Sequence, residues 1–172
     1  MSAPETQPPL KKITLRTADD QLFDVEENVA MEFTTVKSFF DENSDATDDI
    51  VVPLPNVCAD PLVKIIDYCK KHIELKASGE SDSKRYDADF VKEQKYDDLK
   101  ELILAANYLN IKHLLDVLNQ EIANRIKNKS PEFVRRLFGI ENDFTPEEEA
   151  KIRSENAWAF EGVDPDDDDE MQ

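Results

Sequence analysis

Glycine is scarce in this sequence, and its scarcity restricts the ligands that the chain could hold. Only three glycines occur among 172 residues, at positions 79, 139 and 162. None of them lies in a glycine-rich turn between a strand and a helix, which is the place where backbone N–H groups cradle a phosphate. A nucleotide-binding loop of that kind is therefore not expected, and no cofactor is predicted.

Cysteine is nearly as rare, being present only as Cys58 and Cys69. Two cysteines in a chain without secretory features are more typical of buried thiols than of a disulfide framework. With His72 they form the pattern C-x10-C-x2-H, which lacks a fourth ligand and does not match the spacing of structural zinc sites. We therefore expect a buried Cys69, a surface His72 and no metal.

Signals of catalysis are missing as well. His113 follows Lys112 on an expected helix, but no nucleophile signature accompanies it, so a solvated helix surface is the better interpretation. The acidic pair Glu147 and Glu149 is explained by the favourable dipole at the start of a helix. No catalytic residue is assigned, and a noncatalytic protein is expected.

Long apolar runs and basic clusters are lacking too. No window approaches the roughly 18 apolar residues of a membrane span, and the start MSAPETQPPLKK has no apolar signal-peptide core. The formal net charge of −18 repels phosphate backbones. We therefore expect neither a membrane nor a nucleic acid as a partner, and we expect the protein in the cytoplasm and nucleus.

Strand and helix patterns alternate in the first half of the chain. KKITLRT alternates Ile13 and Leu15 with polar residues, which predicts a strand, and QLFDV predicts a second one. The apolar stripe from Val29 to Phe40 predicts one helix. IVVPL predicts a short strand that Pro53 keeps out of any central position in a sheet.

Helix patterns dominate the second half. Asp60-Pro61 predicts the start of a helix. The polar stretch 75–94 reads as a flexible linker. A helix is expected at 97–109, and Asn110 is expected to cap the next one. Further helices are predicted by Ser130-Pro131 with Gly139 as a left-handed cap, and by a capping box of Thr145 and Glu148.

The terminal helices carry more large apolar side chains than they can easily bury among themselves. These are Ile122, Ile126, Phe133, Phe138, Ile140, Phe144 and Trp158. They could pack on the N-terminal unit, or they could form a groove for a partner, because exposed apolar patches with aromatic anchors mark interfaces.

Several long segments carry a resemblance to a known family. ELILAANYLNIKHLLDVL at 101–118 and SPEFVRRLFGIENDFTPEEEAKIRSENAWAFE at 130–161 are the longest, and VPLPNV at 52–57 and YCKKHIE at 68–74 extend the match. The chain thereby resembles the S-phase kinase-associated adaptors of SCF ubiquitin ligases, especially plant-type members, over roughly residues 10–161. The resemblance implies an α/β fold: a BTB/POZ domain, with a small sheet and packed helices, followed by a C-terminal helical extension.

The resemblance also implies a function and a set of contact residues. Family members are noncatalytic adaptors that bridge a cullin N-terminal domain to F-box proteins for ubiquitin-dependent degradation, and a weak homodimer is left open. By motif, Asn107 and Tyr108 would lie on the cullin face. The positions that match the F-box-binding surface are Leu115, Ile122, Ile126, Phe138, Ile140, Asn156 and Trp158.

The expected organisation follows from the same match. The segments are a disordered N-terminus at 1–9, the first part of the BTB/POZ domain at 10–74, a flexible linker at 75–94, helices that complete this domain and start the extension at 95–127, F-box-binding helices at 128–161, and an acidic disordered tail at 162–172.

Three positions depart from the family pattern and keep other functions open. Lys100 stands where relatives usually carry Phe, Tyr86 where they carry Trp, and His113 where Gly or another polar residue is common. An alternative is therefore a divergent paralogue that binds F-box proteins in a cullin-independent complex. A further alternative is an acidic chaperone whose tail binds basic proteins.

Overall fold

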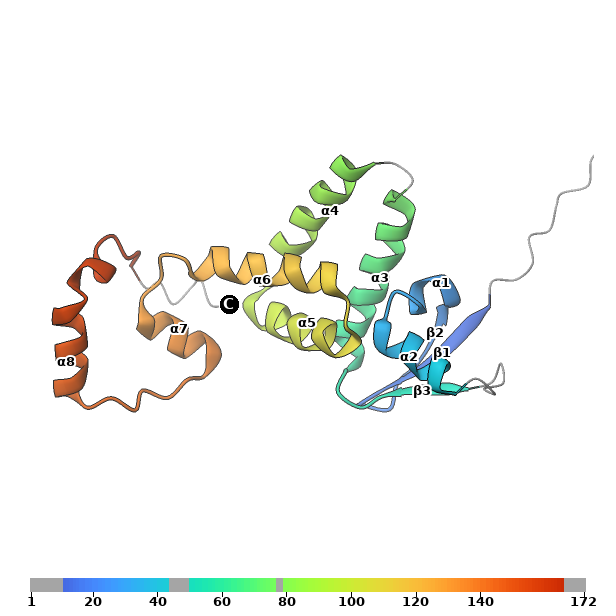
Figure 1. The fold of residues 1–172 in the computed structure, drawn as a ribbon, viewed down its shortest axis with the longest axis horizontal. Helices are drawn as coiled ribbons and strands as arrows, with labels where there is room; N and C mark the ends of the chain where they lie inside the picture. The colour runs from blue at the N-terminus through green and yellow to red at the C-terminus, as the bar shows by residue number, and fades with distance from the viewer. Residues whose placement is uncertain (1–10, 44–49, 77–78, 166–172) are drawn as a thin grey trace, which may run out of the picture.

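A small three-stranded sheet forms one end of the protein (Figure 1). The computed structural model describes residues 11–43, 50–76 and 79–165; the predicted disordered N-terminus and the last seven residues of the predicted tail lie outside these ranges. Strand β1 (Lys12–Thr17) pairs antiparallel with β2 (Leu22–Glu26) and parallel with β3 (Val51–Leu54). The strand order is β2-β1-β3, so Pro53 lies on an edge strand as predicted.

The alternation that predicted β1 places its apolar side chains on the inner face of the sheet. Ile13 and Leu15 are buried, and Ile13 is paired with the buried Val25 of β2.

The prediction of one helix after β2 is wrong. The chain forms α1 (Glu27–Ala30) and then α2 (Thr34–Glu42), because Phe33 adopts an extended conformation between them. Phe33 is nevertheless fully buried, so the apolar stripe serves the core across the break.

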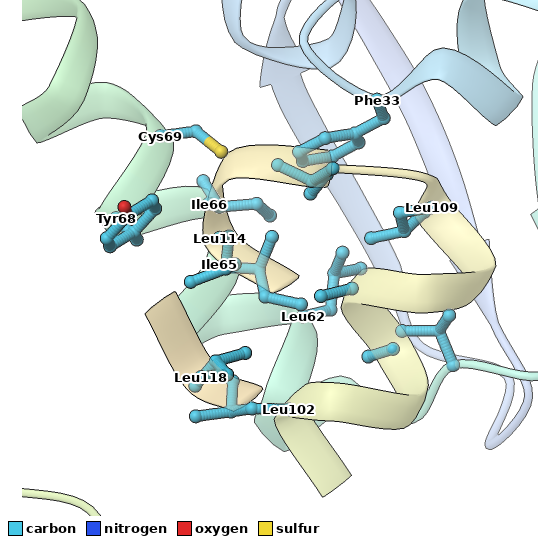
Figure 2. Close-up of a cluster of buried hydrophobic side chains, with 14 of the residues drawn as sticks. Phe33, Leu62, Ile65, Ile66, Tyr68, Cys69, Leu102, Leu109, Leu114 and Leu118 are labelled. Carbon is cyan, nitrogen blue, oxygen red and sulfur yellow. The ribbon is translucent and has the colours of Figure 1, made fainter. Parts of the chain in front are cut away.

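Most of the core beside this sheet comes from three helices (Figure 2), which are α3 (Ala59–Leu75), α5 (Tyr96–Leu109) and α6 (Lys112–Ile126). The side chains exposed by 1% or less include Leu62 and Ile65 of α3, Leu102 of α5, and Leu114 and Leu118 of α6. The predicted start of α3 at Asp60 is one residue late, because the helix begins at Ala59, and its N-cap residue Cys58 makes no side-chain hydrogen bond.

Residues that the sequence predicted to be a flexible linker form helix α4 (Glu80–Lys92). Its apolar face packs on α3: the ring of Tyr68 lies 5.7 Å from that of Tyr86 and 4.9 Å from that of Phe90, measured between centroids. Val91 and Asp87 are buried. The linker prediction is therefore wrong, because a few apolar residues at helical spacing outweigh the polar composition around them.

Asn110 ends α5 instead of capping α6. It adopts a left-handed conformation with φ of 54°, and its N–H donates to Asn107 O at 3.1 Å.

Three elements follow α6 and extend away from the sheet (Figure 1): helix α7 (Pro131–Phe138), helix α8 (Pro146–Glu155) and a 3-10 turn, η1 (Ala157–Phe160). Across the described ranges, no helix has the length and apolar character needed to cross a bilayer.

Candidate functional site

Large apolar side chains are exposed over the terminal helices. Within the described residues, those exposed between α7 and η1 are Phe138, Ile140, Phe144, Ile152 and Trp158. Trp158 has the largest exposed fraction, 74%, and Ile140 is 55% exposed. We call these five residues the terminal apolar surface. A tryptophan this exposed is unusual in a monomeric protein and is typical of an interface anchor.

The structure divides the residues that were predicted to bind an F-box. Phe138, Ile140 and Trp158 belong to the terminal apolar surface. Leu115 and Ile126 of α6 are half-buried against the core, and Ile122 is buried in it. In this conformation the α6 residues therefore stabilise the protein's own fold, and the residues from Phe138 onward offer most of the exposed apolar area.

Helix α7 is built to turn Phe138 and Ile140 outward. The Ser130 side chain accepts a hydrogen bond from the N–H of Phe133 at 2.9 Å, which begins the helix as predicted. Phe133 is buried, and Gly139 ends the helix with φ of 65°, as the sequence indicated. The N–H of Ile140 then donates to Arg135 O at 2.8 Å, which fixes the direction of the chain after the helix.

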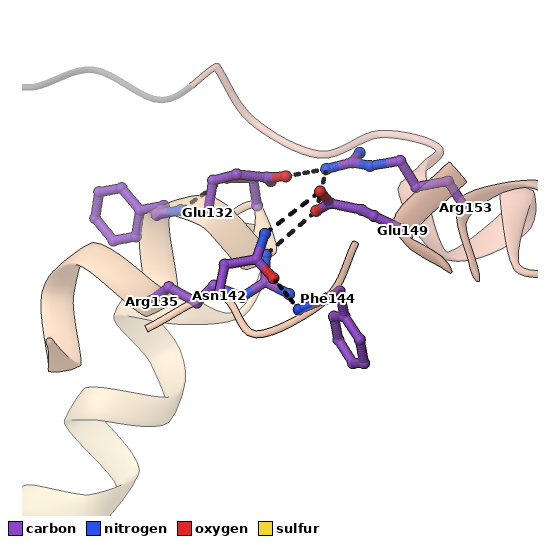
Figure 3. A network of polar contacts seen from close by, with 8 residues as sticks. Glu132, Arg135, Asn142, Phe144, Glu149 and Arg153 are labelled. Atoms are coloured by element: carbon purple, nitrogen blue, oxygen red, sulfur yellow. Dashed lines mark hydrogen bonds and ion pairs between the residues drawn. The ribbon is translucent and has the colours of Figure 1, made fainter. Parts of the chain in front are cut away.

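Helix α8 is held to α7 mainly by polar contacts (Figure 3). Arg153 pairs with Glu132, and Arg135 pairs with Glu149 at 3.3 Å. Burial by itself would raise the pKa of Glu132, but hydrogen bonds from its own backbone and from Arg153 offset this effect and lower the pKa. None of the ten residues of α8, all of which are described, is buried. The predicted capping box is present: Thr145 accepts from the N–H of Glu148, and Glu148 accepts from the N–H of Thr145.

Asn156 positions the exposed tryptophan. Its side-chain amide donates to Ile152 O at 2.9 Å and closes α8, and its own carbonyl accepts from the N–H of Ala159 at 2.8 Å. These bonds start η1, which carries Trp158. Asn156 thus shapes the terminal apolar surface from its edge.

A second surface surrounds the end of α5. Asn107 is exposed and Tyr108 is half-buried. The Thr35 hydroxyl donates to Tyr108 O at 2.5 Å. Tyr108 lines a groove together with Thr35, Phe39 and Pro53.

Leu104 adds an apolar side chain to α5 that sequence reasoning missed. It is 69% exposed and stands one helical turn before Asn107 and Tyr108, so it shares their side of the helix. The spacing of three and four residues between Leu104 and these two residues could have predicted that all three share one face of the helix. We call Leu104, Asn107 and Tyr108 the α5 surface.

Lys100 links α5 to α7. Its ammonium group donates to Leu137 O at 2.9 Å and pairs with Asp97 at 2.6 Å. A phenylalanine could make neither contact. Lys100 therefore makes a polar connection to the helix that carries Phe138.

Cys69 is buried as predicted, whereas both histidines contact Asp87, which was not predicted. Burial raises the pKa of the Cys69 thiol to about 12. His72 is half-buried rather than on the surface, and it contacts Asp87. His113 is exposed but also contacts Asp87. Among the described residues, His72, Asp87 and His113 form the group that could hold a metal ion; sequence spacing alone did not find it.

Comparison with protein families matches two parts of the chain. Residues 11–74 match "Skp1 family, tetramerisation domain", and residues 112–159 match "Skp1 family, dimerisation domain". The first range covers the sheet and α1 to α3, and the second covers α6 to the middle of η1.

Curated relatives match over nearly their whole length. SKP1-like protein 1A of Arabidopsis thaliana is 49% identical over 161 residues, which cover 88% of this chain and 98% of that protein. SKP1-like protein 1 of Oryza sativa subsp. japonica is 47% identical over 171 residues, covering 88% and 96%. SKP1-like protein 14 of Arabidopsis thaliana is 47% identical over 150 residues, covering 87% and 97%.

Proposed function

Because the chain belongs to the Skp1 family, we propose that it is a noncatalytic adaptor of an SCF-type ubiquitin ligase. It would bridge a cullin N-terminal domain to F-box proteins, which bring substrates for degradation. The observation that carries this proposal is the terminal apolar surface, with Trp158 74% exposed on elements that polar contacts hold in place. The same role places the protein in the cytoplasm and nucleus.

The terminal apolar surface supports the F-box side of the proposal. Burial of several hundred Å² of apolar area would contribute on the order of 10 kcal/mol at ~25 cal/mol/Å², before the costs of association. Because α8 contacts α7 through ion pairs rather than a shared core, it can adjust to the partner at small cost. Phe138, Ile140 and Trp158 are the residues that we expect to provide most of this area.

The α5 surface supports the cullin side. Leu104 supplies an exposed apolar side chain, Asn107 supplies an exposed amide, and Tyr108 lines the groove next to α2. It is formed by other elements than the terminal apolar surface, so one chain could hold two partners at once. Adaptor action then consists of positioning, because a substrate held near the transferring enzyme reacts at a high effective concentration.

Calorimetry with purified protein tests the proposal. An isolated F-box domain is titrated first, and a cullin N-terminal domain is added to the product, with gel filtration to detect one ternary peak. Binding of both partners is the expected result. If neither partner binds, the adaptor function is wrong although the family fold is retained.

Trp158→Ala tests the assignment of the F-box surface. Loss of a central aromatic anchor should weaken F-box binding at least about thirtyfold. Leu22→Ala, which removes another well-exposed apolar side chain from β2, is the matched control and should leave binding unchanged. Unaltered affinity of the Trp158 variant would place the interface elsewhere. Ile126→Lys combined with Trp158→Ala should abolish binding in a variant whose circular dichroism spectrum is unchanged; this check is needed because Ile126 packs against the core.

A cullin-independent complex is the second candidate, and Lys100 favours it. Lys100 stands where members of the family usually carry Phe, and its ammonium group donates to Leu137 O. Tyr108→Ala should weaken cullin binding and leave F-box binding intact if the bridge exists. F-box binding without any cullin binding by the unmodified chain would support this second candidate.

A further inference from the structure

Three helices bring both histidines of the chain to one buried carboxylate. His72 of α3 places Nε2 3.0 Å from Asp87 Oδ1, and His113 of α6 places Nε2 3.0 Å from Asp87 Oδ2. Asp87 itself comes from α4. The two imidazole rings lie 4.7 Å apart between centroids, and the three ligand atoms all lie within 4.8 Å of one another.

Asp87 is a buried carboxylate without a permanently charged partner among the described residues. This residue is only 6% exposed, and its ion pairs within the described residues are to the two histidines alone. An imidazole carries charge only when both of its nitrogens are protonated, unlike the permanent cation of Arg. Proteins compensate buried carboxylates by pairing or by metal coordination.

We propose that His72, Asp87 and His113 form a binding site for a divalent transition-metal ion, with Zn²⁺ as the representative ion. Zinc bonds to imidazole nitrogen and carboxylate oxygen of about 2.0–2.2 Å place tetrahedral ligand atoms about 3.3–3.5 Å apart. The two separations of 3.0 Å, which go to different oxygens of Asp87, need to open by only a few tenths of an ångström. The ligand atoms farthest apart, which lie within 4.8 Å of one another, would need to approach by up to about 1.3 Å. Two imidazoles favour zinc, copper or nickel over magnesium and calcium, which prefer oxygen ligands.

Metal binding would leave one proton on each imidazole, at Nδ1, and would release a proton only from an imidazole that was cationic before the ion bound. Each imidazole would coordinate through Nε2 in its neutral form with its remaining proton on Nδ1, and the carboxylate would change from accepting hydrogen bonds to coordinating the ion. The ion's two positive charges would then compensate Asp87 in a chain whose net charge is −18.

Tyr68 supplies an outer contact of the kind that metal sites use. Its hydroxyl donates to Asp87 Oδ1 at 2.6 Å and thereby holds the carboxylate in place. Burial, followed by this hydrogen bond, raises the pKa of Tyr68, so the hydroxyl remains a donor. The His113 side chain is 56% exposed, which leaves a path for the ion and room for water as a fourth ligand.

The site is separate from the proposed adaptor surfaces. None of its three residues belongs to the terminal apolar surface or to the α5 surface. It connects α3, α4 and α6, so a bound ion would hold α4 onto the domain. Its existence does not depend on the adaptor function.

Zinc titration of the full chain with histidine-selective ¹⁵N NMR tests the site. Calorimetry should show one equivalent of Zn²⁺, and the Nε2 signals of both histidines should shift to values of metal-bound nitrogen. His113→Gln removes one ligand at an exposed position and should weaken binding at least about tenfold, because even the loss of an outer contact costs that much. Thermal unfolding of each variant without zinc verifies that it folds.

Two controls separate this site from other zinc ligands. Asp116→Asn changes an exposed carboxylate of the same helix, and conversion of Asp166 to Asp169 into asparagine changes the acidic tail; both variants should bind zinc as the unmodified chain does. Co²⁺ should give a spectrum without a thiolate charge-transfer band. The proposal is overturned by no zinc binding, by unchanged binding in His113→Gln, by unmoved histidine signals, or by binding that depends on the tail or on thiolate.

Discussion

Arg125, like His113, joins helix α6 to helix α4. Its guanidinium donates to Gln94 O at 2.7 Å and to Val91 O at 2.8 Å, and its Nε donates to Glu121 at 2.6 Å. These backbone carbonyls lie at the C-terminal end of α4, where helices leave acceptors unsatisfied and favour positive charge. The same guanidinium lies 5.3 Å from the centre of the Tyr96 ring.

Arg125→Lys should destabilise the protein by about 1–3 kcal/mol, because a lysine ammonium cannot reach two carbonyls and a carboxylate as a planar fork does. Urea unfolding followed by circular dichroism measures this change in the free energy of unfolding. Arg85→Lys is the matched control: Arg85 is well exposed on α4, so its replacement should change stability by less than about 0.5 kcal/mol. Equal effects of the two substitutions would contradict the role of Arg125.

Among single residues, those with local signals were predicted and those defined by tertiary contacts were not. Gly139, Thr145 and Cys69 behave as the sequence indicated, because a cap or a small buried thiol depends on near neighbours. Ile122 has helical spacing in common with Ile126, but the spacing does not reveal that the core takes up its side chain. The sequence did not predict the contacts of Asp87, because its partners His72 and His113 lie 15 and 26 residues away along the chain.

Helices and strands were predictable where their apolar period was clear. β1, β2 and β3 follow from alternation and from the place of Pro53, and α5 begins one residue before the predicted start. α4 was missed because polar composition dominates its first half, although Tyr86, Phe90 and Val91 have helical spacing. The break between α1 and α2 left no signal in the pattern, since Val29, Phe33 and Val36 keep their period through it.

Helix α8 should exchange its amide hydrogens much faster than α5. It buries none of its ten described residues, so it can open locally without exposing core, whereas α5 contributes Leu99, Leu102 and Leu109 to the core. Hydrogen–deuterium exchange with mass spectrometry measures both helices in one sample. Adding an F-box domain should slow the exchange of α8 and leave that of α5 unchanged. Protection of free α8 equal to that of α5 would contradict this account.

At the scale of the whole molecule, negative charge opposes compaction. A net charge of −18 on 172 residues produces self-repulsion that dissolved salt screens. The melting temperature at neutral pH should therefore rise as sodium chloride increases from about 0.01 M to about 0.15 M.

Differential scanning calorimetry measures this dependence, and pH supplies the control. Near the sequence pI of about 4.4 the net charge vanishes, so the same salt series should have little effect on the melting temperature. A melting temperature that falls with salt at neutral pH would mean that ion pairs such as Arg135–Glu149 outweigh the general repulsion.

The weak attachment of α8 also affects the life of the protein in a cell. A copy without its partner exposes Trp158 beside a helix that opens easily, and quality-control proteases and chaperones act on such openings. The proposed complex with an F-box protein would cover the same segment. Surplus copies should therefore turn over faster than assembled ones, and the abundance of the protein would then be matched to the supply of its partners.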